Sequence, residues 1–253
     1  MRALPARLAC VVVLACAAAP ARDVAASADR RAVRALGARG PLGDARLSDE
    51  RSISRYAGAT VRAPVRALPS PTARRVGRLR YLTEDGPFEV YPVLASHLDA
   101  GHRTWLHIRL PERPNGQTGW VPRDALGELK AVRSVLHVSR ASLRAELYRD
   151  GRRIWSSAIG VGTPATPTPA GHFWIRSRLR ALRGDPTYGP YAFGTGAYSV
   201  LSDWPGGGVI GLHGTDRPDL IPGRPSHGCI RMPNQAITSL WRLLEIGTPI
   251  VIV

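Results

Sequence analysis

Short segments in which apolar and polar residues alternate follow one another between residues 59 and 126. In residues 104–110 the alternation places Leu106, Ile108 and Leu110 on the same side, as in a β-strand with one buried face. Asn115-Gly116 is typical of a turn that precedes a further strand. Several closely spaced short strands predict a small β-barrel in this part of the chain.

The same pattern continues from residue 133 towards the C-terminus. Residues 143–148 and 154–160 flank Asp150-Gly151, a dipeptide that favours a tight β-hairpin. Residues 181–208 combine aromatic side chains with many glycines, which predicts a loop that packs over a core or covers a bound substrate.

One segment near the C-terminus has helical periodicity. Apolar side chains recur at helical spacing after Asn234, which is a suitable N-cap, and Gly247 follows as a stop signal. Residues 249–253 are apolar and predict a buried final strand. The chain is therefore predicted to be mainly β, with one short C-terminal helix.

The first 55 residues differ from the rest. Residues 1–28 have a basic start, an apolar stretch too short to span a bilayer, and a small-residue pattern at Ala26-Ser27-Ala28, as in a secretion signal. Val13-Leu14-Ala15-Cys16 also resembles a lipoprotein cleavage site, and lipid on Cys16 is the one route by which we expect a membrane partner. Residues 29–55 lack periodicity and predict a basic linker. We expect an exported protein of the cell wall or periplasm.

The charge of the chain indicates an anionic partner. The 253 residues include 35 Lys and Arg against 19 Asp and Glu, which gives a formal net charge of +16. Such a field attracts polyanions. Because export argues against nucleic acid, an anionic cell wall is the expected partner.

Cysteine usage singles out one thiol. Cys10 and Cys16 lie in the predicted signal, so cleavage after Ala28 leaves Cys229 alone. A single thiol cannot form an internal disulfide in an exported protein. Cys229 is therefore either buried and inert or reactive.

Two neighbouring segments carry the residue types that acyl transfer needs. His213-Gly214-Thr215 ends a predicted buried strand, and Ser226-His227-Gly228-Cys229-Ile230-Arg231 brings a hydroxyl, an imidazole, a thiol and a guanidinium into six residues. In such chemistry a thiolate attacks a carbonyl, an imidazole moves the proton, and backbone amides hold the oxyanion. The guanidinium can bind a substrate carboxylate through two parallel hydrogen bonds.

Spacing favours His213 over His227 as the base for Cys229. His227 is only two residues from Cys229, and the intervening Gly228 is expected to aim its amide, with that of Cys229, at the oxyanion. His213 comes from a separate strand, and a carbonyl such as that of Gly214 is expected to fix its tautomer.

These segments, with Thr168-Pro169-Ala170-Gly171 and the closing Gly247-Thr248-Pro249-Ile250-Val251, resemble the L,D-transpeptidases over residues 131–253. The resemblance implies a β-sandwich catalytic domain that uses Cys229 as nucleophile and His213 as base, with His227 and Gly228 shaping the site and no cofactor or metal. It implies substrate contacts at Ser226, Arg231, Gly214 and Thr215. The implied reaction cuts the bond between a diamino acid and a terminal D-alanine in a peptidoglycan stem peptide and passes the acyl group to an amine, which makes a 3→3 cross-link.

Residues 56–127 resemble a bacterial SH3-type domain through Val76-Gly77-Arg78-Leu79 and Gly116-Gln117-Thr118-Gly119-Trp120-Val121. This resemblance implies a module for wall or peptide binding, and a passive spacer is the alternative.

Other functions stay open beside the transpeptidase hypothesis. L,D-carboxypeptidase activity or a wall-binding adaptor would use the same domains. A papain-like peptidase is disfavoured because its cysteine precedes its histidine in the chain. A metal site at His213, His227 and Cys229 lacks paired cysteines and a fourth ligand.

Overall fold

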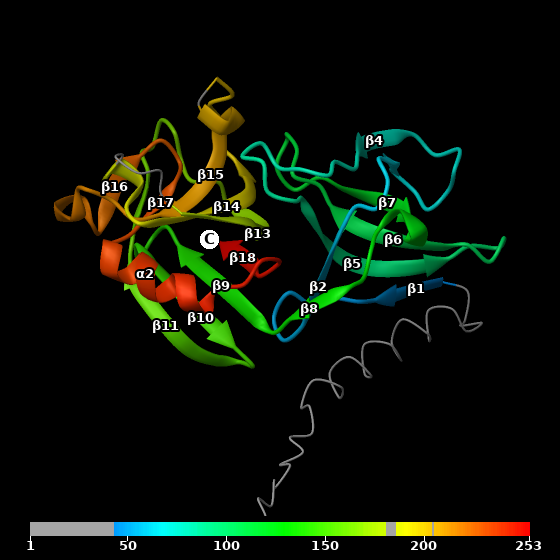
Figure 1. Ribbon diagram of the computed structural model, residues 1–253, viewed down its shortest axis with the longest axis horizontal. Coiled ribbons are helices and arrows are strands. Elements are labelled where there is room, and N and C mark those ends of the chain that lie inside the picture. Colours follow the sequence, from blue (N-terminus) through cyan, green and yellow to red (C-terminus); the bar gives the residue numbers. More distant parts are fainter. Residues whose placement is uncertain (1–42, 181–185, 204) are drawn as a thin grey trace, which may run out of the picture. The chain divides into compact units, whose positions relative to one another are not determined.

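The computed structural model of the protein describes residues 43–180, 186–203 and 205–253 (Figure 1). The predicted signal at residues 1–28, with Cys10 and Cys16, lies outside the described residues, as does the part of the predicted linker before residue 43. No helix within the described ranges is long and apolar enough to cross a membrane.

The N-terminal half of the described residues forms an antiparallel sheet in the order β4-β3-β7-β6-β5-β2-β8, with β1 paired to β5. Its strands are β1 (Gly43–Arg46), β2 (Ser54–Gly58), β3 (Pro64–Arg66), β4 (Arg75–Arg78), β5 (Val90–Leu98), β6 (Thr104–Arg109), β7 (Thr118–Pro122) and β8 (Lys130–Val132). In β6, Leu106 and Ile108 are buried, and Leu106 lies opposite Val121 of β7. The strand predicted for residues 104–110 is therefore confirmed, with its apolar face in the core.

This sheet extends beyond the predicted limits of residues 56–127. β1 and the first residues of β2 lie within the segment 29–55 that the composition indicated as a linker, and β8 lies beyond residue 127. Asp49 orders the connection between β1 and β2, because its carboxylate accepts the backbone N–H groups of Arg51, Ser52 and Ile53. β1 escapes a prediction from periodicity because its only apolar side chain is Ala45.

The C-terminal half forms a mixed sheet in the order β11-β10-β9-β18-β13-β14-β15-β17-β12-β16. Its elements are β9 (Ser134–Ser139), β10 (Arg144–Arg149), β11 (Arg152–Ala158), β12 (Gly160–Gly162), β13 (Gly171–Arg180), β14 (Tyr191–Tyr198), β15 (Val209–His213), β16 (Gly223–Ser226), β17 (Ile230–Arg231), α2 (Asn234–Leu243) and β18 (Pro249–Ile252). Short 3₁₀ turns occupy Arg123–Ala125, Pro186–Tyr188, Pro205–Gly208 and Pro218–Leu220. The predicted mainly β class and the short C-terminal helix are confirmed.

The predicted sandwich of two sheets is replaced by one continuous path of paired strands. The long strand β13 joins its two parts, because its first residues, up to Trp174, pair with β18 and its later residues, from Ile175 onward, pair with β14. Apolar side chains from both parts, among them Leu147, Phe193 and Leu212, meet in one buried cluster. The predicted hairpin at Asp150-Gly151 joins β10 and β11, and both residues have positive φ as a tight turn requires.

The aromatic and glycine-rich region contains a buried strand where the sequence predicted a loop. Residues 191–198 form β14, which lies between β13 and β15. A β-carbon at Gly196 would collide with the ring of Trp174, and one at Gly194 would collide with the hydroxyl of Ser177. The glycines therefore make room for bulky side chains of β13, which explains why they are interleaved with aromatic residues.

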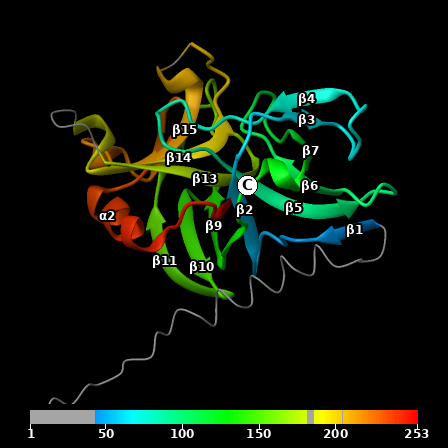
Figure 2. The same cartoon turned by 45° about the vertical axis from the view of Figure 1, so that its right-hand side comes forward.

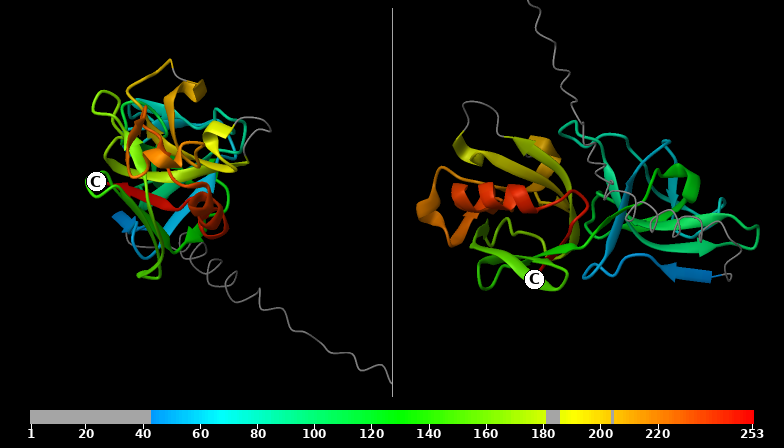
Figure 3. Two further views of the ribbon diagram at one scale, coloured as in Figure 1. Left: turned by 90° about the vertical axis from the view of Figure 1, so that its left-hand side faces the viewer. Right: turned by 60° about the horizontal axis from the view of Figure 1, so that its bottom comes forward.

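Helix α2 begins after Pro233 and lies alongside the strands of the C-terminal half (Figures 2 and 3). Its Ile237 and Leu240 belong to the buried cluster. The side chain of Asn234 makes no capping bond to the helix, so the predicted N-cap is wrong. The helix ends at Leu243, and Gly247, at φ 83°, belongs to the turn that leads into β18.

Candidate active site

Two parallel strands bring the predicted nucleophile and base together. β15 and β17 pair in parallel, with Leu212 opposite Ile230 and His213 opposite Arg231. This register places Cys229 beside Gly211, whose N–H donates to Cys229 Sγ at 3.4 Å. A β-carbon at Gly211 would lie 3.7 Å from His213 Cδ2 and 3.9 Å from the sulfur. The imidazole of His213 and the thiol of Cys229 therefore both lie beside Gly211.

His213 is held as a neutral imidazole with a defined tautomer. Its ring is 2% exposed, and its Nδ1 lies 2.6 Å from the carbonyl oxygen of Gly214, so Nδ1–H donates to that oxygen. Burial lowers the pKa of His213 to about 4, the bond to Gly214 opposes this, and the charge of Arg231 adds to it. The proposed role of Gly214 in fixing the tautomer matches this geometry, and Nε2 is left as the basic nitrogen.

The thiol is also neutral at rest. Burial raises the pKa of Cys229, while the Gly211 N–H and the guanidinium of Arg231 act in the opposite direction. A neutral thiol beside a neutral imidazole suits general-base transfer during attack, in which the sulfur loses its proton as it approaches the carbonyl.

The loop before Cys229 is held by hydroxyl groups. Ser226 Oγ donates to the Cys229 carbonyl at 2.6 Å and accepts the Gly228 N–H at 3.1 Å. Thr168 Oγ1 donates to the Gly228 carbonyl at 2.7 Å and accepts the Gly162 N–H at 2.9 Å. Ser226 therefore supports the loop from within, and the Gly228 N–H, predicted as an oxyanion donor, is engaged there in this conformation.

Gly228 must be glycine for two reasons. Its φ is 124°, a value that residues with a β-carbon rarely adopt, and a β-carbon there would lie 2.6 Å from Ile210 Cδ1. Backbone conformation and close packing therefore both favour glycine at this point.

Beside the dyad lies a small pocket of about 70 Å³. It is lined by four predicted site residues, His213, His227, Cys229 and Arg231, and by residues that include Tyr188, Ser199 and Ile210. His227 is exposed at this pocket, and its carbonyl accepts a hydrogen bond from Ser199 Oγ at 3.0 Å. Within the described ranges, no residue accepts a hydrogen bond from the buried Nε of Arg231.

Thr215 stands behind the dyad rather than at the pocket. Its N–H donates to Asn234 Oδ1 at 2.9 Å, and its side chain is buried. The amide that the sequence assigned to a helix cap therefore fixes the turn after His213. Tyr188 belongs to the aromatic and glycine-rich region 181–208 that the sequence predicted to pack over a core or cover a substrate. Its ring centroid lies 4.8 Å from that of His213, and it lines the pocket.

The donor set does not form a metal centre in the described part of the chain, where no group of three His, Cys, Asp or Glu side chains could hold an ion. The arrangement of a half-buried thiol, an oriented imidazole and an adjacent pocket instead suits cysteine-based acyl chemistry.

Comparison with known proteins makes this class specific. Residues 133–252 match the family model YkuD, described as the L,D-transpeptidase catalytic domain. The Bacillus subtilis (strain 168) protein YkuD, named as a candidate L,D-transpeptidase, is 33% identical over 115 residues, which cover 46% of this chain and 63% of that protein. Residues 133–252 of this protein are therefore similar to the YkuD-type L,D-transpeptidase catalytic domain.

Solved structures show weaker likeness. A crystal structure of a mutant Enterococcus faecium L,D-transpeptidase is 27% identical with a TM-score of 0.38, and it covers 47% of this chain and 49% of that chain. An L,D-transpeptidase from Mycobacterium tuberculosis H37Rv is 15% identical with a TM-score of 0.41, and it covers 60% of this chain and 90% of that chain. The protein spans less than two thirds of YkuD and about half of the Enterococcus chain, and TM-scores this low do not establish a common fold.

Proposed function

We propose that this protein is an exported peptidoglycan L,D-transpeptidase that uses Cys229 as its nucleophile and His213 as its base. The observation that carries the proposal is the hydrogen bond from His213 Nδ1 to the Gly214 carbonyl, beside a half-buried thiol in one pocket. That bond leaves Nε2 to accept the thiol proton.

In the proposed reaction, Sγ attacks the carbonyl carbon of the diamino acid while Nε2 takes the thiol proton. Collapse of the tetrahedral intermediate breaks the bond to D-alanine, whose amine leaves with the proton from His213. An amine of a second stem then attacks the thioester, which regenerates the thiol and forms the 3→3 cross-link. The Cys229 N–H is the remaining predicted donor to the oxyanion.

Arg231 is the proposed recognition group for a stem-peptide carboxylate. It lines the pocket beside Cys229, and a guanidinium can bind a carboxylate through two parallel hydrogen bonds. Ser226, Gly214 and Thr215, predicted as substrate contacts, are engaged in holding the loops on either side of the dyad. We therefore assign them to support of the site.

The N-terminal sheet is proposed to be an SH3-like module that binds the anionic wall. The net charge of +16 and the SH3-type motifs support this role. Cosedimentation of the full protein with intact sacculi at rising salt concentration tests it, and binding that is absent at low salt would leave the module without a wall-binding role.

The transpeptidase proposal is tested with a purified disaccharide–tetrapeptide substrate and mass spectrometry of the products. The wild type should release D-alanine and form dimers, and a carbapenem should add its mass to Cys229. Cys229→Ala should do neither, and His213→Ala should lower the rate about 10²–10⁴-fold. His227→Ala is the matched control, because its exposed ring lies at the same pocket. Shortened monomers without dimers would indicate L,D-carboxypeptidase activity, and a fully active Cys229→Ala would falsify the proposal.

A further inference from the structure

One wall of the pocket belongs to the connection between β14 and β15, and residues of the N-terminal half bind this connection. Residues 199–203 and 205–208, the described parts of the link between β14 and β15, contribute Ser199 and Gly208 to the pocket. The Ser199 N–H donates to the Gly208 carbonyl at 2.8 Å, which closes the base of this connection. Its three consecutive glycines, Gly206, Gly207 and Gly208, have positive φ, a conformation that residues with a β-carbon rarely adopt.

Arg113, which follows β6 in the N-terminal half, binds this connection directly. Its Nη2 lies 3.0 Å from the carbonyl oxygen of Ser199, 3.1 Å from that of Leu201 and 2.9 Å from that of Gly207. The guanidinium also lies over the ring of Tyr198, 4.7 Å from its centroid. The guanidinium of Arg113 thus binds backbone carbonyl groups near both ends of the connection.

The side chain of Asn115 forms hydrogen bonds with both backbone groups of Tyr198, at the end of β14, as a neighbouring strand would. Its Nδ2 donates to the Tyr198 carbonyl at 2.8 Å, and its Oδ1 accepts the Tyr198 N–H at 2.9 Å. Tyr198 precedes Ser199, whose hydroxyl donates to the carbonyl of His227. These contacts link Asn115 in two steps to the peptide that precedes Gly228 and Cys229.

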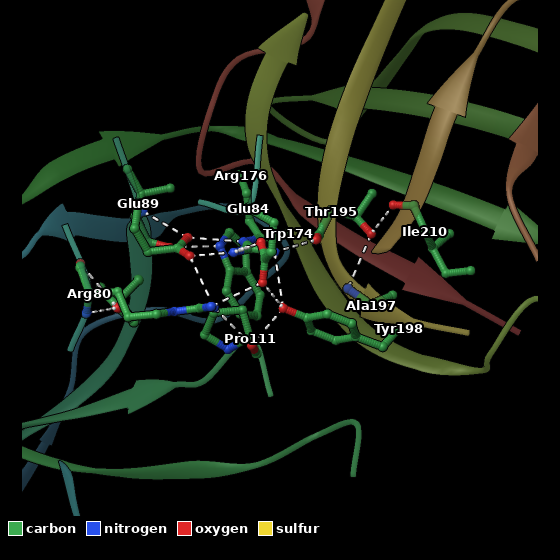
Figure 4. Close-up of polar contacts among 12 residues, drawn as sticks. Arg80, Glu84, Glu89, Pro111, Trp174, Arg176, Thr195, Ala197, Tyr198 and Ile210 are labelled. Carbon is green, nitrogen blue, oxygen red and sulfur yellow. Dashed lines mark hydrogen bonds and ion pairs between the residues drawn. The ribbon is translucent and has the colours of Figure 1, made fainter. Parts of the chain in front are cut away.

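A buried ion pair anchors the other side of this contact (Figure 4). Arg176 of β13 donates from Nε to Glu89 Oε1 at 2.9 Å and from Nη2 to Glu84 Oε2 at 2.8 Å. Tyr198 Oη, in turn, lies 2.6 Å from Glu84 Oε1 and 2.9 Å from the Pro111 carbonyl oxygen, within hydrogen-bond distance of both acceptors for its one proton. Because the carboxylates come from the N-terminal half, the segment that carries Arg113 and Asn115 has a fixed position against β13 and β14.

We propose that Arg113 and Asn115 are positioning residues of the active site, which shape the substrate-binding wall through the connection between β14 and β15. The N-terminal half then contributes to acylation as well as to wall binding. This inference rests on the proposed function of Cys229 for its kinetic readout. It predicts a specific defect, because the dyad itself is built from β15 and the loop before β17 and needs neither residue.

The test uses the full chain with Asn115→Ala, the isosteric Asn115→Asp and Arg113→Ala. Asn115→Asp keeps the acceptor for the Tyr198 N–H but turns a carboxylate oxygen towards the Tyr198 carbonyl, so it should behave no better than alanine. Arg103→Ala is the matched control, because Arg103 is an exposed arginine of the same half whose charge acts on Asp99. All variants should fold, since these side chains are exposed.

We expect acylation by the tetrapeptide and by a carbapenem to fall about tenfold to hundredfold in the Asn115 and Arg113 variants. Alkylation of Cys229 by iodoacetamide should stay within about twofold of wild type, because a small reagent does not need the wall. Hydrogen exchange of residues 198–203 should accelerate in these variants and stay unchanged in Arg103→Ala.

Wild-type acylation in folded variants overturns the inference, and so does a parallel loss of alkylation, which would show a merely structural effect. If the wild type itself forms no acyl-enzyme, the proposed function fails, and hydrogen exchange decides the inference alone. Unchanged exchange of residues 198–203 then overturns it, and accelerated exchange supports it.

Discussion

The buried pair of Arg176 and Glu89 offers a quantitative test of how the two halves of the protein hold together. Both residues are 1% exposed, and Glu89 receives bonds from both Nε and Nη2 of Arg176. Glu89→Ala leaves a buried guanidinium with the Glu84 carboxylate, a Thr195 carbonyl at 3.3 Å and Tyr198 Oη at 3.4 Å as its acceptors. Removing one partner of a buried pair costs about 3–5 kcal/mol, because the other charge stays desolvated.

Two comparison variants show whether the loss of stability depends on burial of the ion pair or only on removal of a charge. The Glu84 side chain is 22% exposed, so water can replace part of its contact with Arg176, and Glu84→Ala should cost about 1–2 kcal/mol. Glu245 faces Arg149 at 3.5 Å with more than half of its side chain exposed, and Glu245→Ala should cost less than about 1 kcal/mol.

The assay is urea unfolding followed by circular dichroism and tryptophan fluorescence. Total stability of a domain is only about 5–15 kcal/mol, so the loss expected for Glu89→Ala is a large fraction of it and shifts the midpoint strongly. Replacing both partners, as Glu89→Leu with Arg176→Met, should recover part of the loss because no buried charge is left alone. The reasoning is refuted if Glu89→Ala is no more destabilising than Glu245→Ala, or if the double replacement is worse than the single one.

Further outcomes follow from the dyad and its loop. Because the pKa of His213 is lowered to about 4, the base stays neutral above that value, and acylation measured against pH should be lost only as the pH falls through about 4; an acid limb near 6.5 would contradict this. Because the pKa of Cys229 is raised, its alkylation should keep increasing above the usual thiol range, and a plateau at neutral pH would indicate a resting thiolate. Thr168→Val keeps the shape but leaves two buried backbone groups unpaired, so thermal unfolding should show a loss of about 1–3 kcal/mol, with Thr163→Val as a more exposed control. Gly228→Ala should abolish acylation through backbone strain and the clash behind it, and an acylation rate equal to wild type would refute that account.

Much of the fold was predictable because local patterns and burial agree. Residues 104–110 alternate and form a strand with its apolar face buried, and Asp150-Gly151 makes the turn that its composition favours. The buried strand β14 was not predictable, because glycines and aromatic residues together look like a loop until the bulky side chains of β13 are known. The contacts of Gly194 and Gly196 with side chains of β13 depend on the tertiary structure, so the local sequence of β14 does not reveal them.

The candidate active site also has features that could be predicted from the sequence and features that could not. Cys229 and His213 were identified from residue types and a family resemblance, but their proximity depends on the parallel pairing of β15 and β17, which no local pattern encodes. Asn234 looked like a helix cap because asparagine commonly is one, and its amide binds the Thr215 N–H instead. The sequence assigned no role to Glu89, because its partner, Arg176, lies 87 positions away in the chain.

The place of β18 has a consequence for the order in which the protein can fold. This strand follows every other strand in the described chain, yet it lies inside the sheet, in parallel with β9 and antiparallel to β13. During synthesis, β9, β10 and β11 emerge from the ribosome well before the strand that joins them to β13. Until β18 arrives, the ladder between β9 and β13 stays open and Cys229 has no completed domain around it. The C-terminal half therefore reaches its folded structure only after β18 has left the ribosome. The thiol of Cys229 is surrounded by its native neighbours only from that point on.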